Sequence, residues 1–259
     1  STAKGVADVH KSTLAGLAVL ALVACSVTLP KIHYSSTLAA STEMSSADIE
    51  LGEAGATYAI EGLRVHVEPL DEVQITALFP EDSKRGRFST NPYSYGNWVD
   101  PLLGYTPVRF TVFRVTVIND IYAKVLLDPL KAVLTTNRGE ELNSYGIPSW
   151  SPHNSFERYY RALRGQSGNE FYRFDLRMGN VRSTAYLEDQ LVFKGESYGG
   201  LIAFDPFAED VEQARLVLED FVLRFDASGQ PLEAVDITID FDRTLEVGQE
   251  EQVATGTDG

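Results

Sequence analysis

A serine between two glycines comes nearest to a catalytic motif in this sequence. Gly195–Gly199 (GESYG) matches the G-x-S-x-G pattern, in which a sharp turn exposes a nucleophilic serine. That serine needs a histidine base, which follows it in the chain in enzymes of this type. The histidines, at positions 10, 33, 66 and 153, all precede Ser197. The pattern therefore predicts a polar turn that leads into a strand, and we expect no enzyme.

Patterns for metal binding are also sparse. His66 and His153 stand alone, and neither H-E-x-x-H nor C-x-x-C occurs. Asp236, Asp240 and Asp242 share one face of an expected strand, and oxygen-rich clusters can bind calcium. Residues two and four apart on a strand are separated by about 7 and 14 Å, which is too far to share an ion without other ligands. We interpret these aspartates as a solvated acidic face, and we expect no metal and no cofactor.

Arginines interleaved with aromatic residues between positions 157 and 182 form the best candidate for binding a partner. In an acidic protein this composition is typical of a protein interface. The alternative is a solvated face with intramolecular ion pairs. The candidate partner-binding residues are Arg158, Tyr159, Arg161, Arg164, Arg173 and Arg177.

A second basic and aromatic stretch runs from Lys84 to Trp98 and allows the same two interpretations. Trp98 and Trp150 lie in segments rich in glycine, proline and asparagine, so a carbohydrate-binding or other ligand-binding face is a further hypothesis. A ligand-binding protein of this kind would need a closed pocket around one of these tryptophans.

The composition is that of a folded protein and argues against nucleic-acid binding. The 259 residues are 44% hydrophobic and 23% charged, which is enough for one large domain or two small ones. The net charge of −15 repels a polyanion. The single cysteine, Cys25, excludes an intramolecular disulfide framework.

Residues 1–30 have the layout of an export signal or a membrane anchor. Lys4, His10 and Lys11 precede an uncharged apolar run, Leu14–Leu29. Within it, Leu22–Cys25 (LVAC) resembles a bacterial lipobox, which implies cleavage before Cys25 and lipidation of that residue. Three interpretations stay open: a cleaved lipoprotein, an uncleaved single-pass anchor, and a buried core helix. The first two place the body in the cell envelope, on the periplasmic or extracellular side of a membrane.

Polar segments flank the expected body of the protein. Residues 31–57 are rich in Ser, Thr and Ala with little apolar periodicity, and we expect a flexible tether. Residues 246–259 are polar and acidic, and we expect a disordered tail. Between them, in residues 58–245, apolar residues repeat every second position, which predicts half-buried strands. These strands are expected at residues 63–67, 73–79, 108–118, 216–225 and 235–241.

One helix is expected within an insertion at about 138–190. Ser151 and Pro152 provide its N-terminus, Gly165 ends it, and its apolar residues fall on one face. The segment 172–178 fits a strand or a helix. Many strands, close turns and few helices predict a mainly β fold, an antiparallel two-sheet sandwich with a small helical insertion.

Three segments resemble the immunoglobulin-like domains of unknown function in bacterial surface lipoproteins. They are Phe110–Asn119 (FTVFRVTVIN), Leu134–Gly139 (LTTNRG) and Phe193–Phe204 (FKGESYGGLIAF). In that family a glycine-flanked acidic turn leads into a strand that ends in an aromatic residue. The resemblance implies a binding or scaffolding module. The chain departs from true immunoglobulin domains in lacking their Cys…Trp…Cys spacing.

These patterns together predict a non-catalytic accessory or scaffolding subunit. It would be anchored to a membrane and dock onto a larger membrane or envelope protein complex, an energy-transducing or transport complex if the anchor is uncleaved. Anchoring raises the effective concentration of the body near membrane partners, and the arginine-rich insertion would provide the contact. The expected partners are a membrane and proteins. The alternative function is a ligand- or carbohydrate-binding surface lipoprotein.

Overall fold

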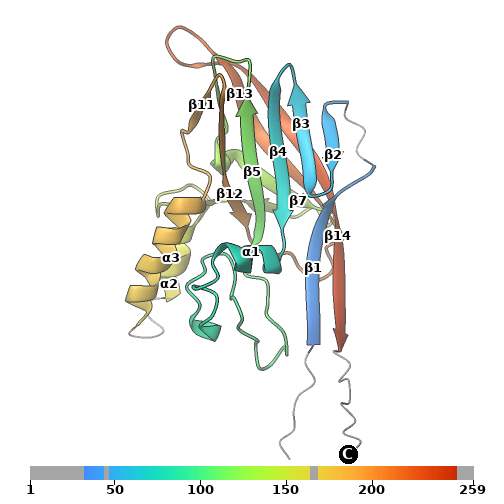
Figure 1. Cartoon of the computed structure of the whole chain (residues 1–259), viewed down its shortest axis with the longest axis vertical. Coiled ribbons are helices and arrows are strands. Elements are labelled where there is room, and N and C mark those ends of the chain that lie inside the picture. The colour runs from blue at the N-terminus through green and yellow to red at the C-terminus, as the bar shows by residue number, and fades with distance from the viewer. Residues whose placement is uncertain (1–31, 44–46, 164–168, 250–259) are drawn as a thin grey trace, which may run out of the picture.

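The computed structural model describes residues 32–43, 47–163 and 169–249. It is mainly β, with two antiparallel sheets packed face to face and helices against the outer face of one of them (Figure 1). The first sheet has the order β1-β14-β13-β6-β11, with β7 pairing to β13 and β8 to β7. Its strands are β1 (Ile32–Ala40), β6 (Lys124–Leu126), β7 (Ala132–Thr136), β8 (Glu141–Asn143), β11 (Leu191–Phe193), β13 (Gln213–Phe225) and β14 (Pro231–Gln249).

The second sheet has the order β12-β5-β4-β3-β2. Its strands are β2 (Ile49–Gly52), β3 (Gly55–Ile60), β4 (Leu63–Leu70), β5 (Thr111–Asn119) and β12 (Glu196–Phe204). The helices are α1 (Glu72–Leu78), α2 (Phe156–Leu163) and α3 (Glu170–Thr184), with 3-10 turns η1 (Gly86–Phe88) and η2 (Pro129–Lys131). A short parallel pair, β9 (Tyr145–Gly146) with β10 (Asn154–Ser155), precedes α2.

Alternating apolar residues fill the space between the sheets. On β14 the inward residues include Ile237, Ile239 and Phe241, and on β5 they include Phe113 and Val115. Burying each such side chain stabilises the fold by about 1.5–3 kcal/mol. The predicted strands on β4, β5, β13 and β14 are therefore confirmed, and the antiparallel, mainly β class with them.

The helices make a third layer on β5 and β12. Phe156 and Tyr160 of α2 and Met178 of α3 pack in one cluster with Val112 and Leu201, which point away from the core between the sheets. The backbone after α3 approaches β12 closely, and the Tyr186 N–H donates to the Leu201 carbonyl at 2.9 Å. A Cβ on Gly200 would lie 2.5 Å from the Tyr186 backbone, so only glycine fits this contact.

Two expectations about secondary structure were wrong. Residues 73–79, expected as a strand, belong mainly to α1, because Asp71 and Gln74 form a capping box that starts a helix. The expected tether, residues 31–57, contains β1, β2 and the start of β3. The small residues of β1 show no strong apolar pattern because this edge strand is held by main-chain pairing with β14 over its whole length.

Other boundaries also differ from expectation. The helix expected from Ser151 begins at Phe156, although its apolar face is confirmed, with Phe156 and Tyr160 buried. The ambiguous segment 172–178 lies in α3. The expected disordered tail is strand as far as Gln249. Residues 250–259 and the expected signal or anchor at 1–30, with Cys25, lie outside the described residues.

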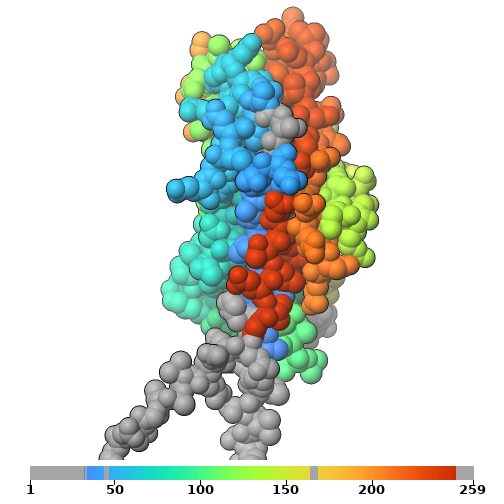
Figure 2. Space-filling view, turned by 90° about the vertical axis from the view of Figure 1, so that its right-hand side faces the viewer, coloured from blue at the N-terminus to red at the C-terminus, as the bar shows by residue number. Residues whose placement is uncertain are grey.

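The two ends of the described chain lie together. Ile32 pairs with Gln249, and Figure 2 shows β1 (blue) beside β14 (red) down to the end where both stop. We call this the terminal end, and the opposite end, at the turn 226–230 between β13 and β14, the distal end (Figure 1). The 19 residues of β14 span roughly 60 Å at 3.3 Å per residue. In the residues that the structure describes, none of the helices combines the length and apolar character needed to cross a bilayer.

Candidate functional site

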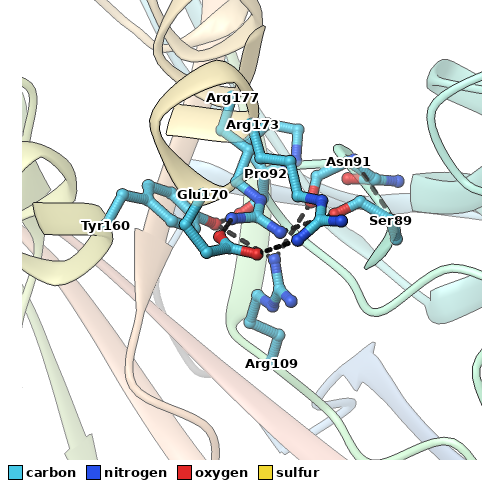
Figure 3. Close-up of polar contacts among 8 residues, drawn as sticks. All are labelled: Ser89, Asn91, Pro92, Arg109, Tyr160, Glu170, Arg173 and Arg177. Atoms are coloured by element: carbon cyan, nitrogen blue, oxygen red, sulfur yellow. Dashed lines mark hydrogen bonds and ion pairs between the residues drawn. The ribbon is translucent and has the colours of Figure 1, made fainter. Parts of the chain in front are cut away.

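The predicted arginine cluster meets the loop before β5 in the third layer (Figure 3). Glu170, Arg173 and Arg177 lie at successive turns on one face of α3. Arg177 is 3% exposed; its Nη1 lies 2.9 Å from Glu170 Oε2, and its Nη2 donates to the Ser89 carbonyl at 2.8 Å. Arg173 also pairs with Glu170. Burial acts to raise the pKa of Glu170, but hydrogen bonds from these two arginines hold that pKa below its usual value.

Arg109, just before β5, is the second buried cation of this cluster and was not among the predicted site residues. Its Nη1 donates to the Asn91 carbonyl at 3.1 Å and to the Tyr160 hydroxyl at 3.3 Å. Its guanidinium also lies over the Tyr95 ring, 4.0 Å from the centroid. The Tyr160 hydroxyl donates in turn to the Pro92 carbonyl. These contacts fasten the loop that precedes β5 to α2 and α3.

The predicted partner-binding residues do not share one open surface. Arg158 donates to the carbonyls of Ser149, Ser151 and His153 and so closes the loop before α2. Arg161 is exposed and pairs with Glu157 one turn earlier. The ring of Tyr159 packs on Phe110 at 5.1 Å between centroids. Arg173 and Arg177 face inward, as above, and Arg164 lies outside the described residues. For Arg158, Arg173 and Arg177 the intramolecular interpretation is the one that the contacts match.

Glu72, at the start of α1, was missed by the sequence reasoning. Both of its carboxylate oxygens are buried and have no hydrogen-bond partner among the described residues. Burial raises its pKa to about 8, although the Arg109 charge opposes the shift. A cavity of about 30 Å³ adjoins it, lined also by Ser36 and Leu38 of β1 and by Thr111 of β5. The only sequence signal was an acidic residue directly after the Asp71 cap.

The tryptophans do not line the clefts found in the described part of the chain. Trp150 is exposed, and Trp98 packs on Tyr95 at 5.3 Å between centroids. Two adjoining clefts of about 450 and 520 Å³ lie instead at the distal end. They share Glu61, Tyr122, Leu223 and Arg224. A further cleft of about 400 Å³ lies on the first sheet, beside Arg215 and Asp240.

The remaining candidate residues have structural surroundings. Ser197 is exposed on β12, and the turn at Gly195 leads into that strand, as predicted. Asp240 accepts hydrogen bonds from Arg215 at 2.6 and 3.1 Å, and Asp242 accepts one from Gln213 at 3.0 Å. Within the described ranges, no three His, Cys, Asp or Glu residues are placed to hold a metal ion.

The contacts of this site are those of a structural cluster that stabilises the packing of the helices in the third layer. Its buried arginines contact a carboxylate, carbonyls and aromatic rings and so join the helices to the loop before β5, while the Nε atoms of Arg109 and Arg177 have no hydrogen-bond partner among the described residues. Glu72 shares its small cavity with the hydroxyl side chains of Ser36 and Thr111, and the Ser36 hydroxyl accepts a hydrogen bond from Arg243. Comparisons with protein-family models, with curated proteins and with solved structures found no match for this chain.

Proposed function

We propose that this protein is a non-catalytic scaffolding or accessory subunit of a membrane or envelope protein complex. Residues 1–30 hold it at the membrane, as a lipidated Cys25 or as an uncleaved helix, and the body lies on the extracytoplasmic side. One observation carries the proposal: β1 begins beside the end of β14 at the terminal end, and in the sequence β1 follows closely on the apolar run Leu14–Leu29. Only two residues of the sequence separate the apolar run from β1.

The shape of the body supports a spacer role. The long β14 carries the distal end roughly 60 Å from the point where the chain enters the sandwich. The third layer is fastened by buried charge-assisted hydrogen bonds: Arg109, just before β5, donates to the Tyr160 hydroxyl on α2, and Arg177 on α3 donates to the Ser89 carbonyl. A rigid spacer fixes the distance at which an anchored protein meets its partner.

The partner contact is proposed at the distal end, with the exposed Arg161 on α2 as a second face. Ile121 is 50% and Leu232 is 69% exposed there, around the cleft that contains Tyr122 and Phe225. Exposed apolar side chains beside a cleft are typical of a protein interaction site. In this proposal the arginine-rich insertion has a structural role: it keeps the body rigid and so fixes the position of the distal end.

Co-purification of the tagged full chain from membranes of its source cell tests this function. The wild-type protein is expected to elute with other proteins in a detergent-stable complex. Ile121→Asp with Leu232→Asp is expected to release it, while Arg138→Ala with Asp210→Ala, an exposed ion pair outside the distal clefts, leaves it bound. Arg161→Glu probes the second face. Elution of the wild-type protein alone would contradict the proposal.

A second candidate function is a ligand-binding surface lipoprotein. The distal clefts favour it, because an aromatic and apolar lining with the charged Lys124 and Arg224 at the rim suits a small ligand. Chemical-shift changes confined to Tyr122 and Phe225 during a glycan or metabolite screen would support it. The strand order differs from that of immunoglobulin domains, because β2 to β5 follow one another as a meander rather than a Greek key.

A further inference from the structure

A closed turn at the terminal end presents two leucines to solvent. Asp100 Oδ1 accepts the N–H groups of Leu102 at 2.7 Å and Leu103 at 3.3 Å. The Gly104 N–H donates to the Asp100 carbonyl at 2.8 Å, and Gly104 has a φ of +78°, which favours glycine. Leu102 is 95% and Leu103 is 41% exposed. The turn is therefore built from its own hydrogen bonds, and its apolar side chains contribute little to the core.

This turn is fastened to the first residues of β1. The Ile32 N–H donates to the Gly104 carbonyl at 3.3 Å. The rings of Tyr34 and Tyr105 stack with centroids 4.3 Å apart and planes 6° from parallel. Figure 1 shows the segment between η1 and β5 (green) at the same end as the start of β1 and the end of β14.

The length of chain between the apolar run and β1 limits how far this turn can lie from a bilayer. From Leu29 to Ile32 a fully extended chain reaches at most about 11 Å. If Cys25 carries the lipid instead, the reach to Ile32 is about 25 Å. Both forms of the anchor thus hold Leu102 and Leu103 within reach of the lipid headgroups.

Basic residues accompany the leucines at this end. The turn η1 is tied to the segment just before the leucines, because the Gly86 N–H donates to Asn97 Oδ1 at 2.9 Å. On η1 and just before it, Arg85, Arg87 and Phe88 are exposed on a protein whose net charge is −15. The leucine turn itself contains Asp100, and the exposed Glu209 lies near Tyr105, so the arginines offset acidic charge at this end. Exposed apolar residues and arginines at one end of a protein are typical of surfaces that sit in the headgroup region of an anionic membrane.

We propose that Leu102 and Leu103 insert into the interface of the bilayer that holds the anchor, as a second membrane contact that fixes the orientation of the sandwich. The occupant of this surface is phospholipid. The inference rests on the anchoring proposed above and adds a contact that residues 1–30 alone do not provide.

Fluorescence quenching by brominated phospholipid tests this contact in the full-length protein, reconstituted into phosphatidylcholine–phosphatidylglycerol vesicles. The probe is Leu102→Trp in a background of Trp98→Phe and Trp150→Phe. The matched control is Leu232→Trp, an exposed leucine at the distal end. We expect brominated lipid to reduce the Leu102→Trp emission at least twofold and to leave the Leu232→Trp emission unchanged.

Each other result overturns a stated part of the account. Protein that floats with the vesicles while Leu102→Trp stays unquenched overturns the second contact and leaves the anchoring intact. Equal quenching of both probes also overturns it, because the body then has no fixed orientation. Protein that fails to float overturns the anchoring and this inference with it. Circular dichroism confirms that the probe variants fold.

Discussion

Arg177 lies over the ring of Tyr160, with its guanidinium carbon 5.2 Å from the ring centroid. The contact joins α3 to α2, and the same guanidinium pairs with Glu170 and binds the Ser89 carbonyl. One side chain thus links both long helices to the loop before β5 (Figure 3). The arginines and tyrosines of the sequence indicated the cluster, but they did not show that its side chains face the interior of the protein.

Removing Arg177 is expected to destabilise the fold strongly. Arg177→Ala removes one of the two partners of Glu170 and the hydrogen bond to the Ser89 carbonyl, and the expected loss is about 1.5–3 kcal/mol. Arg161→Ala removes an exposed pair and is expected to cost less than about 1 kcal/mol. Urea unfolding of both variants measures the difference. Equal stabilities for the two would mean that the cluster does not fasten the third layer.

Arg243 is expected to hold β1 against the body. Its Nε donates to Ser36 Oγ at 2.9 Å, and its Nη1 donates to the carbonyls of Ala208 at 2.6 Å and Val211 at 3.0 Å. Arg243→Ala removes the hydrogen bond to Ser36 of β1 and the one to the Val211 carbonyl, while the Ala208 carbonyl keeps the Val211 N–H, so amide exchange in β1 should become at least tenfold faster. Arg215→Ala, an exposed arginine on the neighbouring strand, is the control. Unchanged exchange in β1 would show that strand pairing alone holds it.

The stability of the fold is expected to fall as pH rises, through Glu72. The pKa of Glu72 is about 8 in the folded protein and near 4.5 when the chain is unfolded, so between these values the native state holds a proton that the unfolded state has lost. The slope from this group is at most about 1.4 kcal/mol per pH unit. Glu72→Gln removes it, so the variant should gain on the wild type between pH 4.5 and 8. The free energies of unfolding of the two proteins are measured across that range. The same pH dependence for both would contradict the raised pKa of Glu72.

Two glycines should respond in opposite ways to alanine. In Gly200→Ala the new Cβ would lie 2.5 Å from the Tyr186 backbone, and the expected loss is about 1–3 kcal/mol. In Gly179→Ala the Cβ meets nothing within 4 Å, on the exposed side of α3, and the expected gain is about 0.5–1 kcal/mol. Thermal unfolding of the pair reports both signs. A neutral Gly200→Ala would mean that β12 and the segment after α3 are not tightly packed.

The sequence predicts the central strands well because their buried apolar residues alternate with exposed polar residues. Val235 to Phe241 and Leu63 to Val67 alternate without interruption, and both segments are strands. Residues 73–79 alternate too, but the cap at Asp71 and Gln74 decides their structure locally in favour of α1. The strand β1 shows little apolar alternation, and as an edge strand it depends on pairing with β14, about 200 residues later.

The residue types of the candidate site could be predicted from the sequence, but the inward orientation of its side chains could not. Arginine next to tyrosine is equally suitable for an interface and for an internal ion pair, and only the tertiary position of Ser89 and Asn91 turns Arg177 and Arg109 inward. Glu72 escaped notice because its pKa depends on burial beneath β1, a strand that the sequence reasoning took for a tether.

The central claim is that the N-terminal segment holds an inert sandwich at a membrane, and an intact mass of the native protein tests it most directly. The protein is isolated from the membrane fraction of its source cell without protease treatment. The account predicts either the mass of a chain that begins at Cys25 with added acyl groups, or that of a chain that retains its apolar run. A native chain recovered only from the soluble fraction, without acyl groups and without residues 1–30, would contradict it.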